Sequence, residues 1–236
     1  MSIALIACRP QSQEIQPEVA SNDTPSRNNV TECMVATQDV TFTHALNNAD
    51  KYAKVLDNGT LEFKCPEGLD FFIDPNGGKL TNTTLPALLT KVDNTKPFTL
   101  TAKVTPEFTP EGLYNAADLL VYANDSLWQK LCFEQDEYGM QRIVSVRTKG
   151  TSDDNNHDKL DVPSVFLKIS SDTHTIASYY SIDNKEWHMV RLYENYYPDS
   201  LLVGVSSQCP KRGSCTSLIE DITLNVDNVK DFRMGK

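Results

Sequence analysis

Three residues at alternate positions of one segment combine side-chain chemistries that recognise sugars. Trp128, Lys130 and Glu134 are two and four positions apart, and in a β-strand they would share one face because side chains alternate along a strand. An indole ring can stack on the apolar face of a sugar, while an ammonium and a carboxylate can hydrogen-bond hydroxyl groups. The row therefore predicts a carbohydrate-binding surface. The alternative is a strand face with a packed tryptophan and an ion pair.

Side chains on the two flanking segments would extend this surface. Asp118 and Tyr122 share one side of the preceding segment, and Ser145 and Arg147 share one side of the following segment. If strand pairing aligns them with Trp128, Arg147 can bind a carboxylate or a pair of hydroxyl groups. The alternative is a ladder of surface charges.

Glu134 also belongs to an acidic group that suggests glycoside hydrolysis. Retaining glycosidases use two carboxyl groups about 5–5.5 Å apart. In a continuing strand Glu137 would face away from Glu134, so the second carboxylate would come from Asp118 unless a bulge realigns the strand. The competing interpretation is that 136–139, which contains Asp136, is a turn.

A three-stranded antiparallel unit is needed to position these residues. The sequence predicts strands at 116–123, 127–135 and 141–148, separated by turn-forming residues. Leu131 and Phe133 alternate with the candidate ligand-binding residues and would face the core.

Roughly a dozen short strands with turn signals between them predict an all-β protein, and no segment shows a sustained helical period. We expect the β-sandwich domain over 37–228, a flexible linker over 9–36 because of its polar composition, and a C-terminal tail over 229–236. The acidic segment 150–163 has no apolar rhythm and is predicted to be a loop.

Several stretches carry a resemblance to a known family: 70–75, 127–134, 143–148 with 152–154, 180–187 and 203–207. In this order they resemble the domain-of-unknown-function 1349 family of the concanavalin A-like lectin and glucanase superfamily, over about residues 40–226. The resemblance implies a jelly-roll sandwich of two antiparallel sheets. It also implies that the concave face of one curved sheet is the ligand groove. It implies no particular activity.

Charge and composition exclude several classes of partner. The chain has 236 residues and a net charge of −10, which disfavours nucleic acid and anionic membrane surfaces. The histidines are scattered and no Cys-x-x-Cys pair occurs, so we expect neither a zinc site nor a cofactor. The acidic residues from Asp153 to Asp161 could bind calcium through their oxygens, but they lack the spacing of an EF-hand, which favours a solvated charged segment.

The N-terminal residues 1–8 are apolar and resemble a truncated signal segment with a bacterial lipobox, which would place a lipid on Cys8. A protein processed in this way would be secreted or tethered in the cell envelope. The alternative is a cytoplasmic protein whose N-terminus is apolar by chance.

The remaining cysteines suggest an oxidising compartment. Cys209 and Cys215 bracket a short loop that a disulfide could close, and Cys33 could pair with Cys65. Cys132 would then remain a free thiol. The competing interpretation is that all these cysteines are reduced thiols in a cytosol.

Together these features predict a monomeric, non-catalytic β-sandwich protein that binds an oligosaccharide or polysaccharide. One alternative is a glycoside hydrolase with an atypical carboxylate pair, Glu134 and Asp118. Another is a structural domain that contacts a second protein.

Overall fold

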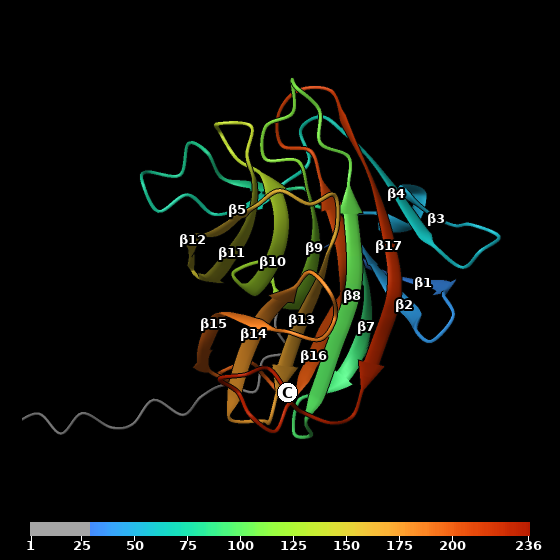
Figure 1. The fold of residues 1–236 in the computed structure, drawn as a ribbon, viewed down its shortest axis with the longest axis vertical. Coiled ribbons are helices and arrows are strands. Elements are labelled where there is room, and N and C mark those ends of the chain that lie inside the picture. The colour runs from blue at the N-terminus through green and yellow to red at the C-terminus, as the bar shows by residue number, and fades with distance from the viewer. Residues whose placement is uncertain (1–28) are drawn as a thin grey trace, which may run out of the picture.

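Two large antiparallel sheets packed face to face make up the fold in the computed structural model, which describes residues 29–236 (Figure 1). In spatial order, sheet A contains β1 (Val30–Ala36), β2 (Thr41–Leu46), β7 (Ala87–Asp93), β16 (Ser200–Gln208), β9 (Ala116–Asn124), β10 (Leu127–Gln135), β11 (Gln141–Lys149) and β12 (Thr151–Leu160). Sheet B contains β15 (His188–Glu194), β14 (Thr175–Ser181), β13 (Val165–Ser171), β8 (Phe98–Pro106), β17 (Ser214–Asn225), β4 (Leu61–Pro66) and β3 (Ala53–Val55). This arrangement confirms the predicted two-sheet jelly-roll sandwich.

Two short elements lie outside the large sheets. A 3-10 turn, η1 (Ala49–Lys51), precedes β3, and β5 (Phe71–Phe72) pairs with β6 (Asn82–Thr83) as a separate ribbon. The chain around this ribbon crosses the outer face of sheet A, and the loop that follows β5 projects to the left in Figure 1.

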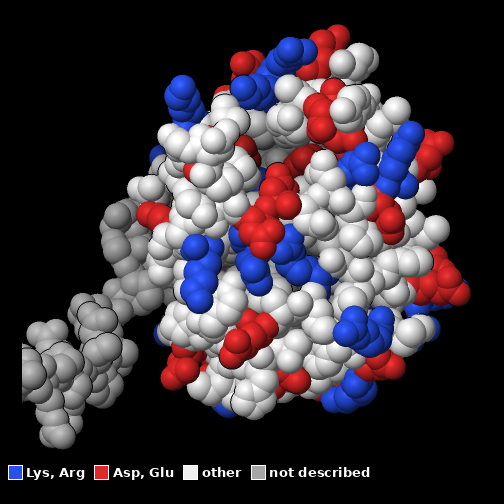
Figure 2. All heavy atoms as spheres, turned by 90° about the vertical axis from the view of Figure 1, so that its left-hand side faces the viewer, with Lys and Arg blue, Asp and Glu red and all other residues white. Residues whose placement is uncertain are grey.

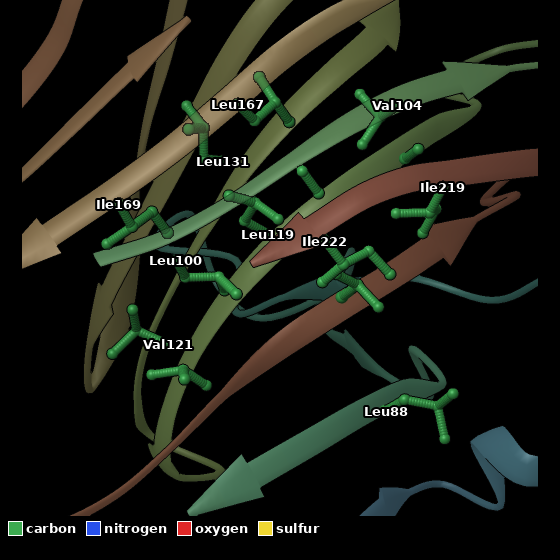
Figure 3. Packing of buried hydrophobic residues seen from close by; sticks show 14 of the residues in the cluster. Leu88, Leu100, Val104, Leu119, Val121, Leu131, Leu167, Ile169, Ile219 and Ile222 are labelled. Atoms are coloured by element: carbon green, nitrogen blue, oxygen red, sulfur yellow. The ribbon is translucent and has the colours of Figure 1, made fainter. Parts of the chain in front are cut away.

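The core lies between the two sheets and follows from alternation along their central strands. Leu119 of β9 and Leu131 of β10 face Leu100 of β8, Leu167 of β13 and Ile219 of β17 (Figure 3). All five side chains are completely buried. Removal of these apolar surfaces from water is the main force that holds the two sheets together.

The three-stranded antiparallel unit predicted around the candidate site is confirmed. β9, β10 and β11 pair as antiparallel neighbours, and 136–139 forms the turn between β10 and β11, where the N–H of Gly139 donates to the carbonyl of Asp136.

Parts of two segments predicted to be irregular form strands. The acidic segment 150–163 contains β12, and the region 9–36 contains β1. Both are edge strands of sheet A, and their side chains are mostly exposed. Because an edge strand needs a hydrogen-bonding neighbour and little burial, it can lack the apolar alternation that identifies central strands.

The predicted disulfides are wrong, because all five cysteines among the described residues are free thiols. Cys33 lies on β1 in sheet A and Cys65 on β4 in sheet B, so these two belong to different layers. Cys209 follows β16 of sheet A and forms an isolated β-bridge with Leu69, whereas Cys215 is the second residue of β17 in sheet B and pairs with Cys65. The loop between them therefore connects the two sheets. The lipidation predicted at Cys8 lies outside the described residues.

The C-terminal residues predicted to form a tail pack against the outer face of sheet B. The Tyr179 hydroxyl donates to the carbonyl of Phe232 at 2.6 Å, and the Lys168 ammonium donates to the carbonyl of Gly235 at 2.9 Å. Val229 is buried there in a small apolar cluster. No helix among residues 29–236 is long and apolar enough to cross a membrane.

Candidate functional site

The predicted alternation along β10 is confirmed. Leu131 and Phe133 pack in the core between the sheets. Trp128 and Cys132 belong to a second apolar cluster on the outer face of sheet A. Lys130 shares that outer face, and so does Glu134, which lies further along the strand.

Trp128 does not lie open to a ligand, and the stacking role predicted for it is wrong. Its ring is completely buried and stacks on Phe71 with a centroid distance of 4.3 Å and an interplanar angle of 8°. Its indole N–H donates to the carbonyl of Asp125. Tyr122 is also completely buried, and its hydroxyl donates to the Asp125 carboxylate. The ribbon of β5 and β6 covers this part of the outer face.

A groove of about 630 Å³ remains open beside the covered aromatic cluster. Its floor is formed by strands of sheet A, and its walls come from the β5–β6 loop on one side and the chain near Tyr114 and Lys211 on the other. Figure 2 shows a hollow on this side of the molecule with acidic and basic side chains gathered around it. The residues that line the groove include Asp70, Phe72, Tyr114, Lys130, Glu134, Glu137, Asp154 and Gln208.

A hydrogen-bonded network occupies the floor of the groove. The Lys130 ammonium donates to the Asp70 carboxylate at 2.9 Å and to the side-chain oxygen of Gln208 at 2.7 Å. The amide nitrogen of Gln208 donates to Glu134 at 3.0 Å and to the carbonyl of Tyr114 at 2.8 Å. Since Gln208 links the cation to the carboxylate, all these groups have fixed orientations before any ligand binds.

Burial and neighbouring charges shift the pKa values of the ionisable side chains on the floor of the groove. Burial acts to lower the pKa of Lys130, but the surrounding carboxylates, chiefly Asp70, outweigh it and raise that pKa. The pKa of Glu134 is well above its usual range because burial disfavours the charged form, and Lys130 only partly offsets this effect. Burial likewise raises the pKa of Asp154. A lysine that stays charged therefore lies beside carboxyl groups that protonate readily.

Tyr114 adopts a backbone conformation that is unusual for a tyrosine. Its φ is +63°, in the left-handed region that costs a residue with a side chain about 1 kcal/mol or more. Its N–H donates to the carbonyl of Gln135 and its carbonyl accepts from Gln208, so both backbone groups hold it at the groove. Tyr114 is half-buried and lines the groove, so a ligand can reach its side chain, whereas the ring of Trp128 is covered.

Asp118 lies on the outer face of sheet A but does not line the groove. It is completely buried opposite Cys132, and within the described part of the chain neither of its oxygens receives a well-formed hydrogen bond. Burial raises its pKa to about 6, with Lys130 acting in the opposite direction. The predicted catalytic pair of Glu134 and Asp118 therefore does not open onto a common groove.

Ser145 and Arg147 lie on the opposite face of the sheet from Lys130, so the predicted alignment is wrong. Ser145 pairs with Leu131 rather than with a residue of the outer face. It is completely buried, and its hydroxyl accepts a hydrogen bond from Arg191 at 3.0 Å. Arg147 lies over the ring of Tyr193. The one-position offset places Val144 and Val146 in the groove instead.

Three site residues escaped the sequence analysis: Asp70, Tyr114 and Gln208. Asp70 begins a stretch that resembles the family, which was a usable signal. Gln208 ends a central strand and Tyr114 lies in a long connection, so neither has a local pattern that indicates a site. Among residues 29–236, no group of three or more His, Cys, Asp or Glu residues is arranged to hold a metal ion.

Comparison with solved structures gives the same fold. A functionally unknown protein from Saccharomyces cerevisiae has a TM-score of 0.69 and 24% identity, with coverage of 78% of this chain and 96% of that chain. The GH43 protein BlXynB from Bacillus licheniformis has a TM-score of 0.57 and 15% identity, with coverage of 86% of this chain and 40% of that chain. A xylan beta-1,4-xylosidase from Bacillus halodurans C-125 has a TM-score of 0.53 and 13% identity, with coverage of 86% and 41%.

This chain thus corresponds to well under half of the GH43 protein and of the xylosidase. No curated protein matches it. The family model described as "Protein of unknown function (DUF1349)" matches residues 46–226. Because this match covers most of the 236 residues, the chain belongs to the DUF1349 family.

Proposed function

We propose that the protein binds a carbohydrate chain in the groove on the outer face of sheet A and does not cleave it. The observation that carries the proposal is the network of Lys130, Gln208 and Glu134 on the floor of a groove of about 630 Å³. Such a network presents donors and acceptors in fixed positions, which suits the hydroxyl groups of a sugar.

Aromatic rings on both walls complement this floor. Phe72 projects from the β5–β6 side, and Tyr114 from the opposite side. A sugar ring has apolar faces that pack against aromatic rings, while its hydroxyl groups reach polar partners. Tyr114 takes the stacking role predicted for Trp128, and its strained backbone supports this assignment because such strain is often retained at binding sites.

The names of the structural neighbours suggest which sugars to test first. A GH43 protein and a xylosidase share the fold, although the region they share with this chain is under half of each enzyme. Xylan fragments are therefore the first ligands to try, followed by β-glucans and other neutral polysaccharides.

Hydrolysis is the second candidate function, and one observation favours it. Glu134 has a raised pKa, as a general acid requires, and shares the groove with the carboxyl groups of Asp70 and Asp154. Asp70 is bound to Lys130, which leaves Asp154 as the candidate partner.

Calorimetric titration with xylo-oligosaccharides, gluco-oligosaccharides and soluble polysaccharides tests binding, and an assay for new reducing ends tests cleavage. We expect binding without cleavage. Glu134→Gln should weaken binding about tenfold, since it replaces a carboxyl oxygen, which can accept a hydrogen bond, by an NH2 group, which cannot. Tyr114→Asn should weaken it similarly, while asparagine still tolerates the left-handed backbone.

Glu186→Gln is the matched control, because Glu186 is exposed on the turn between β14 and β15. It should bind like the unchanged protein. Unaltered binding by both groove variants, with unaltered melting temperatures, would remove the groove as the binding site. Release of reducing ends that disappears in Glu134→Gln would instead establish the hydrolase.

A further inference from the structure

The turn between β10 and β11 is anchored more firmly than a short surface turn requires. The carboxylate of Asp136 accepts the N–H groups of Tyr138 and Met140 at 2.9 and 2.8 Å, and the guanidinium of Arg142 at 3.0 Å. Arg142 also donates to the carbonyl of His157 in β12. The turn is thus tied both to its own strands and to the neighbouring one.

The charge state of Asp136 fits this role. Burial alone would raise its pKa, but the hydrogen bonds donated by Met140, Arg142 and Tyr138 outweigh burial and lower it. The carboxylate therefore remains ionised at neutral pH and holds the turn in one conformation.

This fixed turn presents a large aromatic side chain to solvent. Tyr138 is 76% exposed. Glu137, immediately before it, lines the groove, and the strand before the turn ends next to Tyr114, whose N–H donates to the carbonyl of Gln135. Because hydrogen bonds already order the backbone of this turn at the end of the groove, a ligand that packs against the exposed ring does not have to order the turn.

We propose that Tyr138 forms an outer binding subsite, where its ring stacks on a sugar unit that projects beyond the groove. The ligand of this protein is accordingly a chain of several sugar units, and affinity increases with chain length. This inference rests on the proposed function, because it extends the same groove.

Chain-length dependence tests the subsite. The probes are β-1,4-linked xylose and glucose oligomers of two to six units, titrated by calorimetry into the unchanged protein, Tyr138→Ala and Tyr138→Phe. We expect Tyr138→Ala to lose about fivefold in affinity for the longest oligomer and nothing for the shortest, on the scale of one aromatic packing contact. Tyr138→Phe keeps the ring and should restore the affinity for long oligomers.

Two further variants make the result independent of folding artefacts. Tyr138→Trp places an indole at the subsite, and its emission should shift when a long oligomer binds but not a short one. Ile182→Ala removes another exposed apolar side chain, 58% exposed at a different turn, and should leave all affinities unchanged.

The outcomes separate the inference from the proposed function. If the protein binds oligomers but Tyr138→Ala loses nothing at any length, the subsite is wrong and the groove stands. If Tyr138→Ala weakens all lengths equally, Tyr138 belongs to the central site and the outer subsite is wrong. If the unchanged protein binds no oligomer, both the subsite and the proposed function are wrong.

Discussion

Two lysines, one on the outer face of each sheet, are held in opposite ways. Lys130 in sheet A is almost completely buried, and carboxylates around it, chiefly Asp70, raise its pKa despite that burial. Lys168 in sheet B lies 3.6 Å from the ring centroid of Trp187 and donates to the carbonyl of Gly235. Burial lowers the pKa of Lys168 to about 8.

The difference indicates how the two faces are used. Around Lys130 the chain collects charges and amides and leaves a groove open beside them. Around Lys168 it supplies only an aromatic ring and a carbonyl, and the C-terminal residues close the face. One outer face is therefore built to keep buried charges available, and the other is covered as an additional small core.

The largest expected effect separates the two lysines directly. Lys130→Met leaves Asp70 and Glu134 without their cation, so it should lower the free energy of unfolding by about 3–5 kcal/mol. Lys168→Met removes a charge that has no carboxylate partner among residues 29–236, and it should change stability by about 1 kcal/mol or less. Urea unfolding at pH 7 measures both. Equal losses for the two variants would contradict the comparison.

Asp118 offers the next largest effect. Its pKa of about 6 in the folded state lies above the ordinary value of 3.8 for an aspartate, so the folded state binds the proton more tightly and stability falls as pH rises from about 4 to about 6. The difference of about two between these pKa values corresponds to about 3 kcal/mol in the free energy of unfolding. Asp118→Asn should recover up to about this amount at pH 8 and little at pH 4. Unfolding curves at the two pH values test it, and an equal gain at both would refute the assignment.

The C-terminal contact with sheet B should have a smaller effect. Tyr179→Phe removes the hydrogen bond to the carbonyl of Phe232 at 2.6 Å, and it should cost about 1 kcal/mol. Groove binding should not change, because this contact lies on the other sheet. The exposed Tyr138 provides the control, since Tyr138→Phe should leave stability unaltered.

The smallest expected effect is the titration of Lys168 itself. Its pKa is lower in the folded protein than in the unfolded chain, so the unfolded chain binds more protons and stability rises with pH above about 8. The rise should be modest, because solvent reaches this side chain. Lys168→Met should remove it, and NMR of the lysine side chain should show a midpoint near 8.

Sequence patterns located the central strands but not the residues that cross over them. Alternation along β10 separated Leu131 from Lys130 correctly, because both faces of that strand are in fixed environments. The pattern could not show that Phe71 covers Trp128, since this contact joins segments far apart in sequence. The orientation of Ser145 depended on strand register, which local sequence does not determine.

Polar edge strands are the second feature of the fold that the sequence did not predict. The segment that forms β12 has the composition of a loop, and only its pairing with β11 makes it a strand. A long-range hydrogen bond holds Gln208 and Tyr114 together in the site, and a single sequence carries no signal for such a contact. Asp70, in contrast, lay within a stretch of family resemblance and was within reach of prediction.

The composition of β12 also affects whether two copies of the protein can associate through the edge of sheet A. This strand leaves one row of backbone N–H and C=O groups without a strand partner at the border of sheet A. Asp153, Asp154 and Asp158 lie along it, and acidic side chains on an edge strand disfavour its pairing with the same strand of another copy. The polar composition that hides β12 in the sequence is thus the composition that keeps an open sheet edge from edge-to-edge association.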